Sequence, residues 1–361
     1  MIPTSFDYQS LIDILDRQTP CVLATVIQTQ GSTPQKAGSW ALIGFNQLLA
    51  GTVGGGITEL KVIGQSQLLL ESKKSALISF NLGGDLNKGS ESICGGSMTI
   101  LLDAAPEMHV PVFRQLRNSL EAGSTGVLMT QVDASIPENI QINRRWVLKN
   151  GQQPLTDDIG SRIAPVMDQM LQNTMAGSCH LVSARESEPG TARFTFLESV
   201  IPRPSLFIAG AGHIGQSLAQ LGRFLGFKVT VWDERPEFAD RVKFPEADIV
   251  LTGTVDSGLE HIQIQDNTYL VIVTHGHKSD SEVLRKLIGS GAAYIGMIGS
   301  KAKVSQLKSS FIENGWATAR QWERVFTPIG LEIGAQSVEE IALSIAAQLV
   351  QVRNQKNRND E

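Results

Sequence analysis

Residues 206–215 of the chain read Leu206-Phe207-Ile208-Ala209-Gly210-Ala211-Gly212-His213-Ile214-Gly215. An apolar run typical of a buried strand leads into the spacing Gly-x-Gly-x-x-Gly and then into a helical pattern that begins near His213. In this context Gly210 permits a tight turn, Gly212 lets backbone N–H groups approach a diphosphate, and Gly215 lets helix and strand pack closely. The stretch predicts the first strand, turn and helix of a nucleotide-binding sheet.

The sequence after this unit repeats the same alternation. Short apolar runs at residues 229–232, 249–251, 269–274 and 293–297 alternate with helical segments, which is typical of a parallel, doubly wound sheet. A last amphipathic helix is expected at residues 338–352, after Ser337, whose spacing to Glu340 matches a capping box. We predict a Rossmann-type α/β domain over residues 204–353 and a frayed tail at residues 354–361.

An acidic residue, Asp233, follows the second strand of this domain. A carboxylate at that position accepts hydrogen bonds from ribose hydroxyls in many dinucleotide sites. An adenine nucleotide or a dinucleotide such as NAD would fit, and Arg235 leaves NADP open because an arginine there can reach a 2′-phosphate. The alternative is that the glycines serve only strand-to-helix packing and that no ligand binds.

Two further loops follow strands at the carboxyl edge of the predicted sheet, where open α/β sheets bind ligands. The first contains His275, His277 and Asp280, which suit a bound metal, proton transfer or the orientation of a ligand. Asp280 has a simpler alternative role, as a first-turn carboxylate matched to the helix dipole. The second loop contains Gly299, Ser300 and Lys301, whose N–H groups and ammonium could hold a phosphate or carboxylate.

The N-terminal part, residues 1–200, is predicted as a separate α+β domain. The segment Ile201-Pro202-Arg203-Pro204 cannot continue a strand ladder, because proline lacks a donor, and it places the boundary. Within this part, Gly54, Gly55 and Gly56 open a helix with Glu59 in its first turn, a geometry that can hold an anion. A second glycine-rich loop carries Cys94, Gly95 and Gly96.

The bulk composition excludes several classes of function. The chain has 361 residues, a net charge of −5 and no long basic cluster, so nucleic acid is not an expected partner. It lacks an apolar run long enough to cross a membrane and has no signal-peptide core near residue 1, so we expect a cytoplasmic protein. Its three cysteines lack a C-x-x-C spacing and suggest neither a disulfide framework nor a zinc site.

The motifs of both halves, taken in order, resemble the XdhC/CoxI family, accessory proteins for molybdenum hydroxylases such as xanthine dehydrogenase. The resemblance spans roughly residues 11–353, and residues 106–198 contribute little to it. The motifs that carry it are Gly31-Ser32-Thr33-Pro34, Gly54-Gly55-Gly56 with Glu59, Cys94-Gly95-Gly96, Gly210 to Gly215, His275-Gly276-His277 with Asp280, Tyr294-Ile295-Gly296-Met297-Ile298-Gly299-Ser300, and Pro328-Ile329-Gly330 with Ile333-Gly334-Ala335.

This resemblance implies a chaperone rather than an enzyme that turns over a small substrate. Such a protein binds the molybdenum cofactor, assists its sulfuration by a cysteine desulfurase, and delivers it to the apo-hydroxylase. The chemistry is compatible, because molybdopterin carries a phosphate that glycine-rich helix starts can hold and a thiolate suits a metal–sulfur centre. Cys94 is then the candidate thiol for contact with molybdenum.

Other functions remain open from the sequence. The main alternative is an NAD(P)-dependent oxidoreductase with His275 or His277 as its acid–base group, although a Rossmann fold alone does not supply a substrate clamp. A nucleotide-sensing regulator would keep the Rossmann site without either chemistry. A homodimer is also open, since two-fold dimers are the commonest oligomers.

Overall fold

The computed structural model describes residues 8–82, 95–148, 160–172, 178–183 and 193–359. The chain divides into two compact units, Met1–Pro202 and Arg203–Glu361. We refer to them as the N-terminal and C-terminal units.

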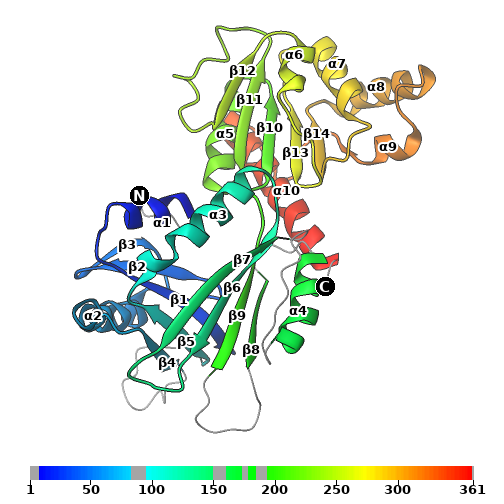
Figure 1. The fold of residues 1–361 in the computed structure, drawn as a ribbon. Coiled ribbons are helices and arrows are strands. Elements are labelled where there is room, and N and C mark those ends of the chain that lie inside the picture. The colour runs from blue at the N-terminus through cyan, green and yellow to red at the C-terminus, as the bar shows by residue number, and fades with distance from the viewer. Residues whose placement is uncertain (1–7, 83–94, 149–159, 173–177, 184–192, 360–361) are drawn as a thin grey trace. The chain divides into compact units, whose positions relative to one another are not determined.

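The C-terminal unit contains a six-stranded parallel sheet (Figure 1). Its strand order is β12-β11-β10-β13-β14-β15, the order 3-2-1-4-5-6 of a dinucleotide-binding Rossmann fold. The predicted α/β class is therefore confirmed. The strands are β10 (Ser205–Ala209), β11 (Lys228–Asp233), β12 (Ile249–Thr252), β13 (Thr268–Ile272), β14 (Tyr294–Met297) and β15 (Val325–Phe326).

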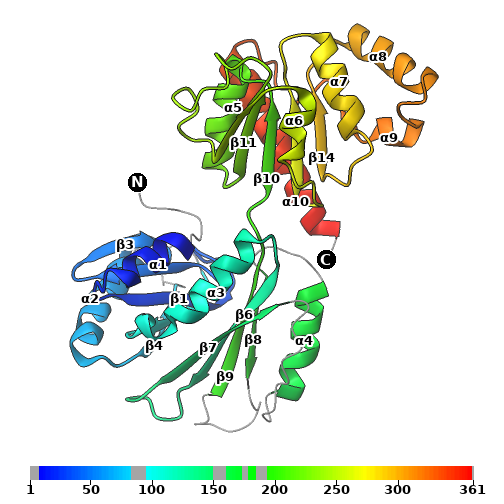
Figure 2. The ribbon, with the colours of Figure 1, turned by 45° about the horizontal axis from the view of Figure 1, so that its top comes forward.

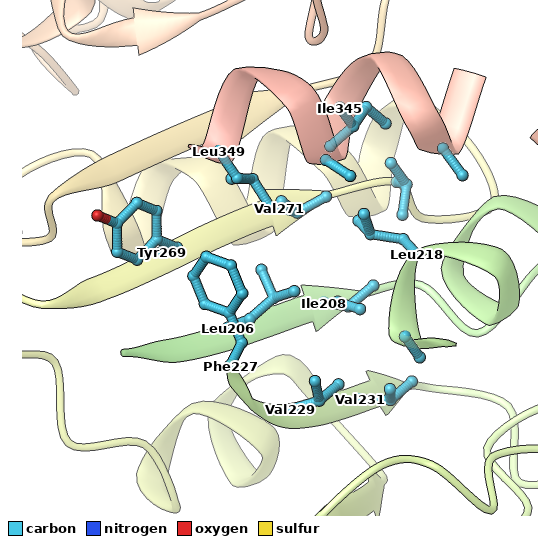
Figure 3. Close-up of a cluster of buried hydrophobic side chains, with 14 of the residues drawn as sticks. Leu206, Ile208, Leu218, Phe227, Val229, Val231, Tyr269, Val271, Ile345 and Leu349 are labelled. Carbon is cyan, nitrogen blue, oxygen red and sulfur yellow. The ribbon is translucent and has the colours of Figure 1, made fainter. Parts of the chain in front are cut away.

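Helices cover both faces of this sheet (Figure 2). The helices α5 (His213–Phe224) and α10 (Val338–Asn359) pack on one face, where Leu218, Ile345 and Leu349 meet the β10, β11 and β13 side chains (Figure 3). The opposite face is covered by α6, α7, α8 and α9. Their bounds are Val255–Glu260, His277–Leu287, Lys301–Glu313 and Ala319–Glu323.

Two details of this unit differ from the sequence-based expectation. The helix α10 continues to Asn359, so residues 354–359 extend the helix rather than forming a frayed tail. The short strand β15 has only two residues, too few for a periodic pattern, and the sequence did not predict it. The capping box at the start of α10 is confirmed, because Ser337 Oγ accepts from the Glu340 N–H at 3.2 Å and Glu340 Oε2 accepts from the Ser337 N–H at 3.0 Å.

The N-terminal unit is built on two antiparallel sheets. The first has the order β3-β2-β1-β5-β4, with α2 (Gly56–Ser72) on one face and α1 (Tyr8–Asp16) and α3 (Val110–Glu121) on the other. The helix α3 follows a single 3₁₀ turn, η2 (Pro106–His109). The strands are β1 (Val22–Gln30), β2 (Trp40–Gly44), β3 (Gln47–Gly51), β4 (Ala76–Asn81) and β5 (Ser97–Asp103).

The second sheet has the order β7-β6-β9-β8 and carries α4 (Gly160–Gln172) on one face. Its other face packs against the first sheet, where Ile27 and Leu101 meet Val132 and Phe196. The strands are β6 (Gly126–Asp133), β7 (Gln141–Leu148), β8 (Cys179–Ser183) and β9 (Arg193–Val200). This arrangement confirms the predicted α+β class of the N-terminal part.

The helices of the described residues are also informative about membranes. None of them combines the length and the apolar character that crossing a bilayer requires.

Candidate functional site

The three glycines of the turn after β10 have two different surroundings: two are in close contact with backbone atoms and one is open. A Cβ on Gly215 would lie 2.0 Å from the carbonyl oxygen of Gly210, and a Cβ on Gly210 would lie 2.2 Å from the carbonyl oxygen of Val273. Both positions exclude a side chain, and the second contact places this turn directly against the loop after β13. At Gly212, by contrast, a Cβ would meet nothing within 4 Å.

The open position at Gly212 lies at the N-terminus of α5. Gly212 is the N-cap residue and His213, which is exposed, is the first residue of the helix. The first N–H groups of a helix have no intrahelical acceptor and lie at the positive end of its dipole. These residues therefore fit the phosphate of a nucleotide, as the spacing of the motif indicates.

The carboxylate of Asp233, which was expected to bind a ribose, already accepts hydrogen bonds within the protein. Its Oδ2 accepts from the Ala211 N–H at 2.8 Å and from Arg235 at 3.0 Å, and its Oδ1 accepts two further hydrogen bonds from Arg235. Burial would raise the pKa of Asp233, but the hydrogen bonds from Arg235 and Ala211 hold it below its usual value. Asp233 thus anchors the glycine turn to Arg235, and its four lone-pair positions are already used.

Arg235 is held in turn by its neighbours. In addition to the paired contacts with Asp233, its guanidinium lies 3.9 Å from the centre of the Phe238 ring. A nucleotide ribose or 2′-phosphate would have to compete with these contacts. The phosphate-binding part of the fingerprint therefore fits a ligand better than the ribose-binding part does.

The three predicted site residues of the loop after β13 differ in their exposure to solvent. His275 and His277 are exposed, whereas Asp280 in the first turn of α7 is 3% exposed. Asp280 Oδ1 accepts from both the backbone N–H and the hydroxyl of Thr274, at 3.1 and 2.6 Å. Burial raises the pKa of Asp280 to about 6, and the hydrogen bonds from Thr274 offset part of that rise.

A pocket of about 240 Å³ lies between α7 and α8 and includes His277, Asp280 and Gly299. Two neighbouring predicted residues do not line it. Ser300 caps α8 by accepting from the Lys303 N–H at 3.4 Å, and Lys301 is exposed and pairs with Glu332 at 3.7 Å. The structure thus brings residues of the loop after β13 (His277 and Asp280) and of the loop after β14 (Gly299) to one pocket.

Three glycine-rich segments of the N-terminal unit meet at one place, which we call the glycine junction (Gly31, Gly54, Gly55, Gly56, Gly95 and Gly96). A Cβ on Gly96 would lie 2.4 Å from the carbonyl oxygen of Ser32, and one on Gly54 would lie 2.8 Å from the Pro34 ring. The segments are therefore in direct contact. At Gly55, Gly56 and Gly95 a Cβ would meet nothing within 4 Å.

Glu59 supports the junction from the first turn of α2. Its Oε1 accepts from the Thr52 hydroxyl at 3.0 Å, and the same hydroxyl oxygen accepts from the Gly54 N–H at 3.2 Å. The carboxylate and the hydroxyl together hold the start of the triple-glycine turn. Sequence reasoning selected Glu59 but missed Thr52, although a hydroxyl two residues before a glycine turn is a recognisable local signal.

The predicted thiol contact, Cys94, lies outside the described residues; in the sequence it directly precedes Gly95. Within the described part of the chain, Cys21 is buried and Cys179 is half-buried, and no group of three or more histidine, cysteine or acidic side chains is arranged to hold a metal ion. Sequence reasoning assigned no role of their own to Thr274 and Lys303. The contacts that make these two residues relevant depend on the fold rather than on a local pattern.

Matched alanine substitutions separate the two roles of the glycines after β10. We expect Gly215→Ala to lower the free energy of unfolding by about 1–3 kcal/mol, because its Cβ would overlap a backbone oxygen. Gly212→Ala should change it by less than about 0.5 kcal/mol, since the site is open and φ is −74°. Chemical denaturation measures both variants.

The same pair tests the nucleotide hypothesis. Calorimetric titration with NAD, NADP and AMP should show weaker binding to Gly212→Ala than to the wild type, because the added methyl group occupies the phosphate approach. If the wild-type protein binds none of the three, the glycines serve packing alone.

Comparison with known proteins gives matches in both units. The XdhC Rossmann domain matches residues 206–349, and the XdhC and CoxI family matches residues 14–81. A Bacillus subtilis protein named as a probable xanthine dehydrogenase subunit is 26% identical over 350 residues, which cover 96% of this chain and 98% of that protein.

Two further comparisons cover different extents of the chain. The uncharacterised protein YqeB of Escherichia coli is 32% identical over 169 residues, which are 46% of this chain and 31% of YqeB. A crystal structure of a Bacillus halodurans protein described as a xanthine dehydrogenase has the same fold. The TM-score is 0.74 at 24% identity, and the alignment covers 97% of this chain and 96% of the other.

Proposed function

Because this chain belongs to the XdhC and CoxI family, we propose that it is an accessory protein of a molybdenum hydroxylase related to xanthine dehydrogenase. In this role it binds the molybdenum cofactor as cargo, assists its sulfuration by a cysteine desulfurase, and delivers it to the apo-enzyme. The relative from Bacillus subtilis supports the partnership, because it aligns along nearly the whole chain and its name connects it with xanthine dehydrogenase.

The observation that carries this proposal is the glycine junction. Gly55 and Gly56 have positive φ values of 63° and 54°, and they precede and begin α2. Backbone N–H groups at such a turn and at a helix N-terminus form a concave site for an anion. The space over Gly55, Gly56 and Gly95 leaves room for the phosphate of molybdopterin.

Cys94 supplies the second requirement of the proposal, a soft ligand. It is adjacent in sequence to Gly95, which is exposed and lies in the junction. A thiolate is both a nucleophile and a ligand suited to metal–sulfur chemistry. We therefore assign Cys94 to contact with the molybdenum centre and the junction glycines to the phosphate.

Replacing Cys94 by serine tests this assignment. In cells that co-express the hydroxylase, Cys94→Ser should abolish most of the activation of the hydroxylase and lower the pterin content of the purified accessory protein. The oxidised pterin is measured by fluorescence after release from the protein. The fold should be retained, so far-UV circular dichroism and thermal unfolding should match those of the wild type.

Cys21→Ala is the matched control, because Cys21 lies in the core and burial raises the pKa of its thiol to about 12. It should leave activation and pterin content unchanged. Equal pterin content and equal hydroxylase activation in Cys94→Ser and wild type would remove Cys94 from the mechanism. Loss of pterin binding in both variants would point to a folding defect instead.

A second candidate function is an NAD(P)-dependent oxidoreductase. The observation in its favour is the strand order of the C-terminal sheet, with the open Gly212 turn beside the point where that order reverses between β10 and β13. The bound phosphates would be held by the first N–H groups of α5. Mass spectrometry of small molecules released from the purified protein distinguishes the candidates, since a pterin supports the first and a dinucleotide the second.

A further inference from the structure

The pocket between α7 and α8 has a composition suited to a small ring. Met297, Val304 and Leu307 contribute apolar walls, while Asp280, His277 and Lys303 contribute polar groups. Pockets for drug-sized ligands have volumes of about 300–1,000 Å³. At about 240 Å³ this pocket is smaller, and it suits a ligand of one or two rings.

The carboxyl group of Asp280 is held in place through only one of its two oxygens. Both hydrogen bonds from Thr274 are accepted by Oδ1, and Oδ2 accepts none from the described residues. Asp280 is 3% exposed and forms no ion pair with the described side chains. Because Asp280 lines the pocket, Oδ2 is available to accept a hydrogen bond from a donor that enters the pocket.

The other polar side chains of the pocket restrict which ligand could donate a hydrogen bond to Asp280. Lys303, half-buried, and His277, exposed, line the same pocket, and a lysine ammonium only donates hydrogen bonds. A cationic ligand would be repelled by Lys303. A neutral ring that offers an N–H beside a carbonyl oxygen satisfies both Asp280 and Lys303, and its faces suit the apolar walls.

We infer that this pocket binds a small oxo-substituted nitrogen heterocycle, with a ring N–H donating to Asp280 Oδ2 and a ring carbonyl accepting from Lys303. This chemistry is shared by oxopurines and by the pterin ring. The inference follows from the pocket itself, and only the pterin source rests on the proposed accessory function.

Titration calorimetry at pH 7.5 with the full chain tests the inference, using xanthine and 2-amino-4-oxopteridine as separate probes. At least one probe should bind the wild-type protein, and Asp280→Asn should weaken that binding by about 10- to 100-fold. The asparagine keeps an acceptor for Thr274 and replaces the second oxygen by an NH₂ donor, so the loop should stay folded. Unchanged thermal unfolding of Asp280→Asn verifies this.

Lys278→Ala is the matched control, since Lys278 is an exposed side chain of the same segment that does not line the pocket. It should bind the probe as the wild type does. Selective binding of the pteridine would assign the pocket to pterin rings, and selective binding of xanthine would assign it to oxopurines. If neither probe binds, or if Asp280→Asn binds equally tightly, the inference is wrong.

The accessory function is measured separately, as activation of the hydroxylase in cells. Hydroxylase activation in cells can fail while the heterocycle still binds the purified protein, and this result would overturn the proposed function alone. Failure of both probes together with normal activation would overturn the pocket assignment alone.

Discussion

Replacing Arg144 by leucine should lower the free energy of unfolding of the N-terminal unit by about 3–5 kcal/mol. Arg144 in β7 is 4% exposed and forms an ion pair with Asp103 at the end of β5, which is 2% exposed. The pair joins the two sheets of the unit. Without the guanidinium, the Asp103 carboxylate would remain buried without a cation.

His109 does not replace Arg144 as the cation. Its Nε2 lies 3.9 Å from Asp103 Oδ2, but burial first and the nearby Arg144 second lower the pKa of His109 to about 4. The imidazole is therefore neutral at pH 7. The Arg144 guanidinium is the charge that compensates Asp103 at this pH.

Urea denaturation at pH 7 measures the effect, and Arg145→Leu is its matched control. Arg145 is the next residue of the same strand and is exposed, so its replacement should change stability by less than about 0.5 kcal/mol. The double variant Asp103→Asn, Arg144→Leu should recover part of the loss, because it removes the buried Asp103 charge together with its cation. Equal losses for Arg144→Leu and Arg145→Leu would contradict this account.

Replacing Glu198 by glutamine should stabilise the protein at pH 8 by roughly 3 kcal/mol. Glu198 in β9 is 9% exposed, and burial raises the pKa of its carboxyl to about 7, although Arg144 opposes the rise. The folded state therefore binds the Glu198 proton more tightly than the unfolded state does. Stability from this group is present below the unfolded pKa, near 4.5, and is lost as the pH rises through about 7.

Denaturation curves recorded between pH 4 and pH 8 check the sign and the window. Wild-type stability should decline over this range relative to Glu198→Gln, and the two proteins should be nearly equal at pH 4. Glu71→Gln, an exposed position on α2, is the control and should follow the wild-type curve. A Glu198→Gln curve parallel to that of the wild type would mean that Glu198 does not titrate in this range.

The C-terminal fold was predictable because its signals are local. The strand, turn and helix at residues 206–215 constrain one another within a few residues, and the Gly215 contact with Gly210 is part of the same turn. The capping box of α10 likewise depends on Ser337 and Glu340 alone. The strands β3, β8 and β15 were not predicted, because they lie outside the regular alternation of apolar strand and helix that identified β12 and β14, which are only four residues long.

The candidate sites were predictable as residue types but not as arrangements. The spacing of His275, His277 and Asp280 suggested a shared role, yet the structure leaves both histidines exposed and buries the carboxyl. Asp233 is at the expected strand end, but Arg235 and the Ala211 N–H occupy its oxygens. Which partner a polar group takes depends on the three-dimensional neighbourhood.

The sequence alone thus determined the Rossmann-type unit, the α+β class of the N-terminal part and the family resemblance, because strand and helix periods and glycine turns are encoded by residues close together in the chain. The tertiary structure decided which distant segments meet. Gly31, Gly54 and Gly96 form one junction, and Asp103 pairs with Arg144 across two sheets. Asp280 and Lys303 line one pocket. These contacts depend on how buried surfaces pack, which no local period specifies.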